Sequence, residues 1–145
     1  MMIKERSGQV ALEYILIFAI SLILLIIFTI PLTQQSVENT LDVSDTVNVK
    51  SDMEKIAQAA MQVYGEGQGS KHSVNVICQR SLKVNIDNNY ISSNLKLKDG
   101  TYKLIKVNYD SNLPKSSIYL SKGENTIVVE WPVDCENMKI YTKLF

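Results

Sequence analysis

The chain has 145 residues, which is room for one modest domain and an appendage, and its 15 Lys and Arg residues balance its 15 Asp and Glu residues. This balance leaves no overall field that would favour nucleic acid or an acidic substrate as a partner. The charges are unevenly spread, because none occurs between Glu13 and Glu38 and most lie in the second half. Composition thus separates an apolar N-terminal part from a polar remainder.

The first element is the apolar run Tyr14–Ile30, which has 17 residues. As a helix it would be about 26 Å long, close to the thickness of a bilayer core, and it lacks the polar stripe of a soluble core helix. A secretory signal fits less well, because its apolar region is shorter and no A-x-A cleavage site follows here. Lys4 and Arg6 precede the run, so we expect a cytoplasmic N-terminus and a single-pass protein with its C-terminal domain outside.

Pro31 closes the apolar run and predicts a kink, or an interruption of the helix within 31–48. An amphipathic helix follows, with apolar residues at spacings of three and four, and Gly65 is its natural stop. Its predicted apolar face consists of Val49, Met53, Ile56, Ala57, Ala60, Met61 and Tyr64. We therefore expect helix over 9–64 and a Gly-rich hinge over 65–72.

Residues 73–145 change to a period of two and predict a β domain. Asp99-Gly100 predicts a two-residue hairpin turn, and Lys122-Gly123 predicts another turn. Leu104-Ile105 predicts a bulge or a strand covered on both faces. The expected strands lie around 74–78, 82–86, 95–97, 102–109, 118–120, 127–131 and 138–145. The predicted fold class is α+β, a long N-terminal hydrophobic helix followed by a small, mostly antiparallel β domain.

Two cysteines, Cys78 and Cys135, lie in this β domain. They are either two separate buried thiols or one disulfide, and the predicted extracellular location favours the disulfide. Such a bridge would stabilise the domain by about 4 kcal/mol in the chain-entropy model.

No constellation of residues supports catalysis, a metal or a cofactor, so we do not expect an enzyme. His72 stands alone in the Gly-rich segment without other candidate ligands. Five lysines are expected to form solvated faces that deter edge pairing: Lys83, Lys96, Lys98, Lys103 and Lys106. A nucleic-acid surface would need exposed aromatic residues beside them, which the sequence cannot place, so nucleic acid is not an expected partner.

Glu13 stands at the mouth of the apolar run, four residues after the Gly8-Gln9 junction. A carboxylate near a helix N-terminus is mildly favoured by the macrodipole, but this does not account for its combination with a short basic leader and a Gly-Gln junction. The segment resembles archaeal type IV pilin-like proteins with class III signal peptides, whose mature helix begins with the pattern Q-x-S-x-E-x-x-x-L. Gln9, Glu13 and Ile17 occupy the Gln, Glu and Leu positions, and Ala11 replaces the serine.

The resemblance implies that residues 1–8 are a leader, which a membrane prepilin peptidase removes between Gly8 and Gln9. Glu13 then becomes the fifth residue of the mature chain. The new α-amino group on Gln9 would be largely cationic at neutral pH and could neutralise Glu13 within a filament. The resemblance thus identifies Gly8 and Gln9 as processing residues, and Gln9 with Glu13 as assembly residues.

We therefore expect a structural subunit, either a major or a minor pilin, of an archaeal type IV pilus-like filament. Its expected partners are other pilins, the prepilin peptidase and assembly machinery, the membrane before assembly, and surfaces or other cells. The alternative is a membrane-anchored extracellular binding or adhesion domain that never polymerises. Only the leader and Glu13 distinguish the two interpretations.

Overall fold

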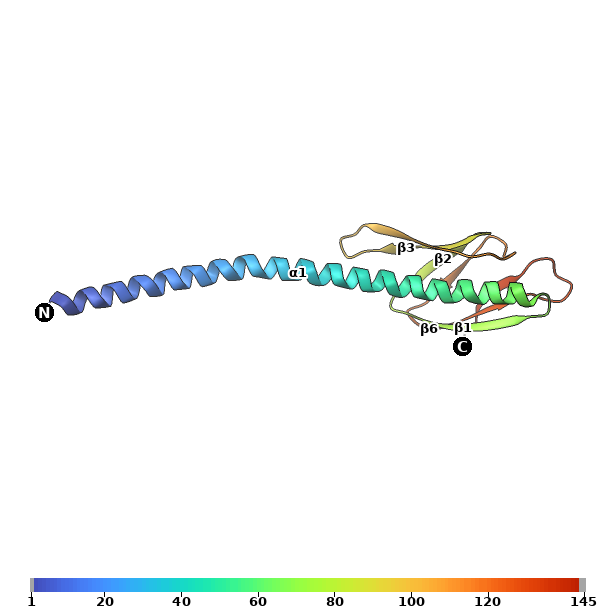
Figure 1. Ribbon diagram of the computed structural model, residues 1–145, viewed down its shortest axis with the longest axis horizontal. Helices are drawn as coiled ribbons and strands as arrows, with labels where there is room; N and C mark the ends of the chain where they lie inside the picture. The colour runs from blue at the N-terminus through green and yellow to red at the C-terminus, as the bar shows by residue number, and fades with distance from the viewer. Residues whose placement is uncertain (1, 144–145) are drawn as a thin grey trace. The chain divides into compact units, whose positions relative to one another are not determined.

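The computed structural model describes residues 2–143, and the side chains from residue 8 onward (Figure 1). Within these residues it has one helix, α1 (Met2–Glu66), followed by seven strands. Contacts within the chain define two compact units, Met1–Leu41 and Asp42–Phe145. The side chains of Lys4 and Arg6, on which the predicted orientation depends, lie outside the described residues.

Helix α1 contains Pro31 and continues through it, so the interruption that we allowed within 31–48 is not found. A proline removes one backbone donor, which a helix tolerates when neighbouring hydroxyls bond to its backbone. Thr33 donates from Oγ1 to the carbonyl oxygens of Ile30, at 2.8 Å, and Thr29, at 3.1 Å. Thr29 donates in turn to Leu25, at 2.6 Å. The hydroxyls of Thr29 and Thr33 thus bond to helix carbonyls that precede Pro31.

Residues 42–66 of α1 belong to the second unit, and one face of this part is buried. The buried apolar residues are Val49, Met53, Ile56, Ala57, Ala59, Ala60 and Val63. The amphipathic pattern therefore identified most of the face, but Met61 and Tyr64 are more than one-third exposed. Tyr64 instead stacks on Trp131, with ring centroids 5.7 Å apart.

The helix ends two residues later than expected, because Gly65 is helical and Gly67 forms the C-terminal cap. Gly67 has a φ of 87°, and its N–H donates to the carbonyl of Val63 at 3.1 Å. This is the left-handed cap that glycine adopts without steric cost. The connection to the first strand therefore contains only residues 67–70.

The strands form two antiparallel sheets, which confirms the predicted α+β fold class. One sheet has the order β1-β6-β7 and the other the order β4-β3-β2-β5. The first contains β1 (Lys71–Cys78), β6 (Gly123–Glu130) and β7 (Lys139–Lys143), and the second contains β2 (Leu82–Ile86), β3 (Tyr90–Lys96), β4 (Tyr102–Asn108) and β5 (Ser116–Leu120). The last two residues of the predicted final strand lie outside the described residues.

The helix and both sheets share one hydrophobic core. Met53, Ile56 and Val63 of α1 join Val76 and Ile127 of one sheet and residues of the other in a single buried cluster. The residues that the four-stranded sheet contributes are Leu82, Val84, Ile86, Ile91, Leu95, Ile105, Ile118 and Leu120. In the view of Figure 1, labelled strands of the two sheets lie on either side of the packed part of the helix. The second unit is thus a complete small domain that includes its own helix.

Two local predictions about turns and strands need correction. The β3–β4 hairpin has a three-residue loop rather than a two-residue turn, since Leu97 N–H donates to Thr101 O at 2.8 Å and Gly100 has a φ of 87°. The predicted turn at Lys122-Gly123 is found, since β5 ends at Leu120 and β6 begins at Gly123, and it joins strands of different sheets. The register of β3 with β4 is continuous, so there is no bulge at Leu104-Ile105.

The predicted disulfide is wrong, because Cys78 and Cys135 are free thiols. Cys78 is the last residue of β1 and pairs with Gly123, whereas Lys71 at the other end of β1 pairs with Glu130. Cys135 lies near that other end, where its carbonyl accepts hydrogen bonds from Trp131 Nε1 and Gln68 Nε2. The strand between the two ends is about 23 Å long at roughly 3.3 Å per residue, whereas a disulfide requires Cα atoms within about 7 Å.

Candidate processing and assembly site

Gly8, Gln9 and Glu13 all lie on exposed turns of helix α1. Gln9 and Glu13 are four residues apart, so they occupy one face of the helix and are within reach of each other. Neither side chain has a hydrogen bond or an ion pair with another described residue. The two predicted assembly residues are therefore on the same face, and the carboxylate of Glu13 is available to an outside partner.

The helix that follows Glu13 is apolar on every side from Tyr14 to Ile30. Phe18, Leu25 and Phe28 are each at least 65% exposed, and no residue from Gly8 to Leu41 is buried. Burying such a side chain is favourable by about 1.5–3 kcal/mol, so this stretch requires lipid or other helices as its surroundings. In the part of the chain that the structure describes, one helix is long and apolar enough to cross a membrane, by length and composition.

The two aliphatic hydroxyls of this apolar stretch, those of Ser21 and Thr29, are satisfied within the helix, unlike the carboxylate of Glu13. Ser21 donates to the carbonyl of Ile17 at 2.8 Å, and Thr29 donates to that of Leu25 at 2.6 Å. A hydroxyl bonded to its own helix enters an apolar environment at low cost. An ionised carboxylate cannot donate to the carbonyls of its own helix in this way. Glu13 therefore requires either water at the membrane surface or a cation from another molecule.

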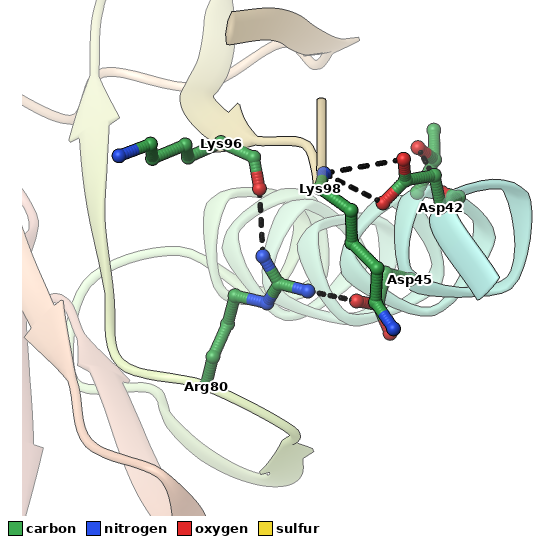
Figure 2. A network of polar contacts seen from close by, with 6 residues as sticks. Asp42, Asp45, Arg80, Lys96 and Lys98 are labelled. Carbon is green, nitrogen blue, oxygen red and sulfur yellow. Dashed lines mark hydrogen bonds and ion pairs between the residues drawn. The ribbon is translucent and has the colours of Figure 1, made fainter. Parts of the chain in front are cut away.

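A second polar cluster lies where α1 joins the domain core, and the sequence did not reveal it. Figure 2 shows Asp42 and Asp45 of the helix facing the β1–β2 loop and the β3–β4 hairpin. Asp42 accepts hydrogen bonds from the backbone N–H of Lys98, at 3.1 and 3.2 Å. Asp45 pairs with Arg80, which also donates to the carbonyl of Lys96 at 2.7 Å. The i,i+3 spacing of the two aspartates was the available signal, but their partners come from distant loops.

This cluster defines the first point at which the helix contacts its own β domain. Asp42 is the first residue of the second unit, and Asp42 and Asp45 are the first partly buried positions along the described helix. The Asp45–Arg80 pair retains some solvent access, with side-chain exposures of 18% and 36%. Hydrogen bonds that involve charged groups are stronger than neutral ones, so the cluster fastens two loops to the helix.

Among its described residues, the β domain gathers no cluster of candidate metal ligands around His72. His72 lies within β1, where it pairs with Val129. Within the described part of the chain, no three His, Cys, Asp or Glu side chains are grouped so that they could hold a metal ion.

Residues 7–32 match the family described as class III signal peptide. This match contains Gly8, Gln9, Glu13 and the apolar stretch, and covers 26 of the 145 residues. No curated protein and no solved structure matches the chain. The chain thus has a type IV pilin-like N-terminus of the class III kind. Such an N-terminus with its hydrophobic helix is typical of a membrane-anchored or surface-exported protein that a prepilin peptidase processes.

Proposed function

We propose that the protein is a structural subunit, a pilin, of an archaeal type IV pilus-like surface filament. The observation that carries this proposal is Glu13, a carboxylate without an internal partner in a helix that is apolar on every side. A simple membrane anchor does not need this group. A filament whose helices bundle together does need it, if each subunit brings a matching cation.

Processing between Gly8 and Gln9 would supply that cation. Cleavage frees the α-amino group of Gln9, whose pKa is ordinarily about 7.7–8.0, so most of the mature chains carry a positive charge at neutral pH. When the apolar helices bundle, the Gln9 amine of one subunit lies against the Glu13 carboxylate of its neighbour. Residues 1–8 serve as the leader until this cleavage.

The main effect of this pair is on register rather than on net stability. Desolvation of the two charges offsets much of their attraction, so the pair adds little to the free energy of assembly. A subunit that is shifted along the bundle would instead bury Glu13 without a partner, which costs several kcal/mol. Because Gln9 and Glu13 are also four apart on one helix, an intrachain contact competes before assembly.

The β domain is displayed by the helix under this proposal. Residues 42–145 hold their own core, so they need no contribution from sister subunits to fold. The domain would lie outside the cell, and the helix would pass from the membrane into the filament core with the help of the assembly machinery. The same self-contained core favours the second candidate, a binding or adhesion domain that stays anchored in the membrane and never polymerises.

Two measurements test the proposal separately. Mass spectrometry of the mature protein should show an N-terminus at Gln9, and a chain that keeps Met1 or Met2 would contradict processing. Replacement of Glu13 by Ala or Val should leave membrane insertion intact and greatly reduce the amount of protein in sheared filaments. Glu38→Ala is the matched control, because Glu38 is another exposed acid of the same helix. Equal incorporation of the Glu13 and Glu38 variants would remove the proposed role of Glu13, whereas absence of the unchanged protein from sheared filaments would favour the anchored domain.

A further inference from the structure

The four-stranded sheet is unusual in its charge. Its strands β2, β3, β4 and β5 contain no Asp or Glu residue, although they contain four lysines and three tyrosines. The chain as a whole has equal numbers of acids and bases. The absence of acids from these described strands therefore concentrates positive charge on one side of the domain.

Most of these side chains lie on the outer face of the sheet. The inner face is marked by buried Val84, Ile91 and Ile118, and side chains alternate between faces along each strand. The outward positions include Lys83, opposite Tyr119, and Lys96, opposite Tyr102. Lys106 lies on the same face, opposite Ser92. Tyr90, two residues from Ser92 on β3, lies on this face as well, so three lysines and three tyrosines share one surface that spans all four strands.

The lysines of this outer face are not neutralised by the protein. No described carboxylate lies within ion-pair distance of Lys83, Lys96 or Lys106. The Lys83 ammonium is instead 5.8 Å from the centre of the Tyr119 ring, and that of Lys106 is 3.7 Å from the Tyr90 ring. These contacts place positive charge beside aromatic rings and leave it free to attract an anion.

The three-stranded sheet provides an internal contrast. Its Lys71 lies 3.1 Å from Glu130, and hydrogen bonds to Glu130 and to Tyr141 raise the pKa of Lys71 above its usual value. A lysine beside a tyrosine on that sheet therefore already has its counter-ion within the protein. The lysines on the outer face of the four-stranded sheet have no such counter-ion among the described residues.

The tyrosines of the outer face are available for stacking. Tyr102 is 69% exposed and Tyr119 is 70% exposed, although aromatic rings contribute most to stability when they are buried. Tyr102 lies on one edge strand and Tyr119 on the other. The edges are about 14 Å apart across the sheet, at roughly 4.8 Å per strand, and Lys83 lies on the strand next to Tyr119. The spacing suits an extended polymer that crosses the strands.

We propose that this outer face binds single-stranded nucleic acid, with bases stacked on Tyr102 and Tyr119 and phosphates held by Lys83, Lys96 and Lys106. Aromatic rings presented on a four-stranded sheet stack unpaired bases, and nearby cations track the backbone. A duplex keeps its bases paired and offers the tyrosines no stacking surface. An acidic polysaccharide would match the lysines but offers no aromatic bases to the exposed rings. The sequence alone argued against nucleic acid, because the exposed aromatic residues that it would require could not be placed.

The test uses the full chain in micelles of a neutral detergent and a fluorescent oligo(dT) of 15 nucleotides, followed by fluorescence anisotropy. Three phosphate contacts predict that binding weakens about 20-fold between 50 and 200 mM salt. Tyr102→Ala and Tyr119→Ala should each weaken binding by about 5- to 150-fold. Tyr102→Phe and Tyr119→Phe keep an aromatic ring and should bind as tightly as the unchanged chain. Replacing Lys83 or Lys106 by Gln should make the salt dependence shallower.

Matched controls distinguish binding at this face from non-specific binding. Tyr141→Ala on the three-stranded sheet should bind oligo(dT) as well as the unchanged chain. A duplex of the same length and heparin, a sulfated polysaccharide, serve as competitors and should displace oligo(dT) only at much higher phosphate or sulfate concentration. Absence of binding, equal binding of duplex, preferential binding of heparin, or indifference to both tyrosine variants would each overturn the proposal. None of these outcomes depends on filament formation, so the two proposals can fail independently.

Discussion

The two parts of helix α1 have the same backbone conformation but opposite surroundings. Residues 8–41 have no buried side chain, and their exposed residues are mostly apolar from Tyr14 to Leu32. Residues 42–66 bury one face against two sheets and keep polar residues on the other. Secondary structure therefore does not determine what a helix packs against. The distribution of apolar residues around the axis does, because an all-round apolar surface needs partners on every side.

The largest expected effect tests this difference at one buried position. Ile56 is fully buried in the core, so Ile56→Ala should lower the free energy of unfolding of the β domain by about 2–5 kcal/mol. Ile27→Ala makes the same chemical change in the other part of the helix, where the residue is 58% exposed. Ile27→Ala should leave the midpoint of urea unfolding unchanged. Urea unfolding in neutral micelles, followed by the fluorescence of Trp131, measures the stability of both variants. Equal destabilisation by Ile56→Ala and Ile27→Ala would contradict the division of the helix into a packed part and an exposed part.

The sequence predicted this contrast well because it depends on local spacing. The charge-free run and the three-and-four pattern from Val49 onward are properties of neighbouring residues on one helix. The same holds for most of the strands, but the start of β3 at Tyr90 was missed, because Ser92 and Ser93 interrupt the apolar alternation there. The continuity of the helix through Pro31 was not predicted, because a proline inside a helix removes a backbone hydrogen bond and usually kinks or ends it.

The errors concern pairings between distant segments. The disulfide prediction counted two cysteines in one exported domain, but the register of β1 with β6 places them at opposite ends of a sheet. Likewise, nothing local shows that Arg80 meets Asp45, or that Tyr102 and Tyr119 share a face with three lysines. At the assembly site, by contrast, the family-like motif of Gly8, Gln9 and Glu13 occupies six consecutive residues and could be identified directly.

A second prediction uses Cys78, which lies in the core beside the packed part of the helix. Burial, together with the nearby negative charge of Asp52, raises the pKa of its thiol from 9.0 to about 11. As the pH rises, the thiol therefore ionises at a lower pH in the unfolded chain than in the folded chain. The stability that the buried thiol contributes is complete below pH 9 and is lost as the pH rises toward 11. The free energy of unfolding should fall by no more than about 2 kcal/mol over this range on account of Cys78.

Urea unfolding at pH 8, 9, 10 and 11 measures this loss. Cys78→Ala should be less stable than the unchanged chain at pH 8 but should show a shallower decline with pH. Tyr109→Phe is the control for a second buried group that shifts in this direction, because burial also raises the pKa of Tyr109. A Cys78→Ala variant with an unchanged pH dependence would show that the thiol is not held in its neutral form by the core.

The smallest effect is expected at the point where the two parts of the helix meet. Arg80→Gln removes the ion pair with Asp45, and we expect a loss of about 1 kcal/mol because the pair is only partly buried. The change should be concentrated locally, with faster amide hydrogen exchange at Asp45–Val49 and little change near Ile56. Lys50→Gln removes the exposed Lys50–Glu54 pair, 3.8 Å apart, one turn along the same helix, and should have almost no effect. If the two variants exchange alike, the contacts of Arg80 do not hold this end of the helix on its domain, and the boundary at Asp42 depends on the apolar face alone.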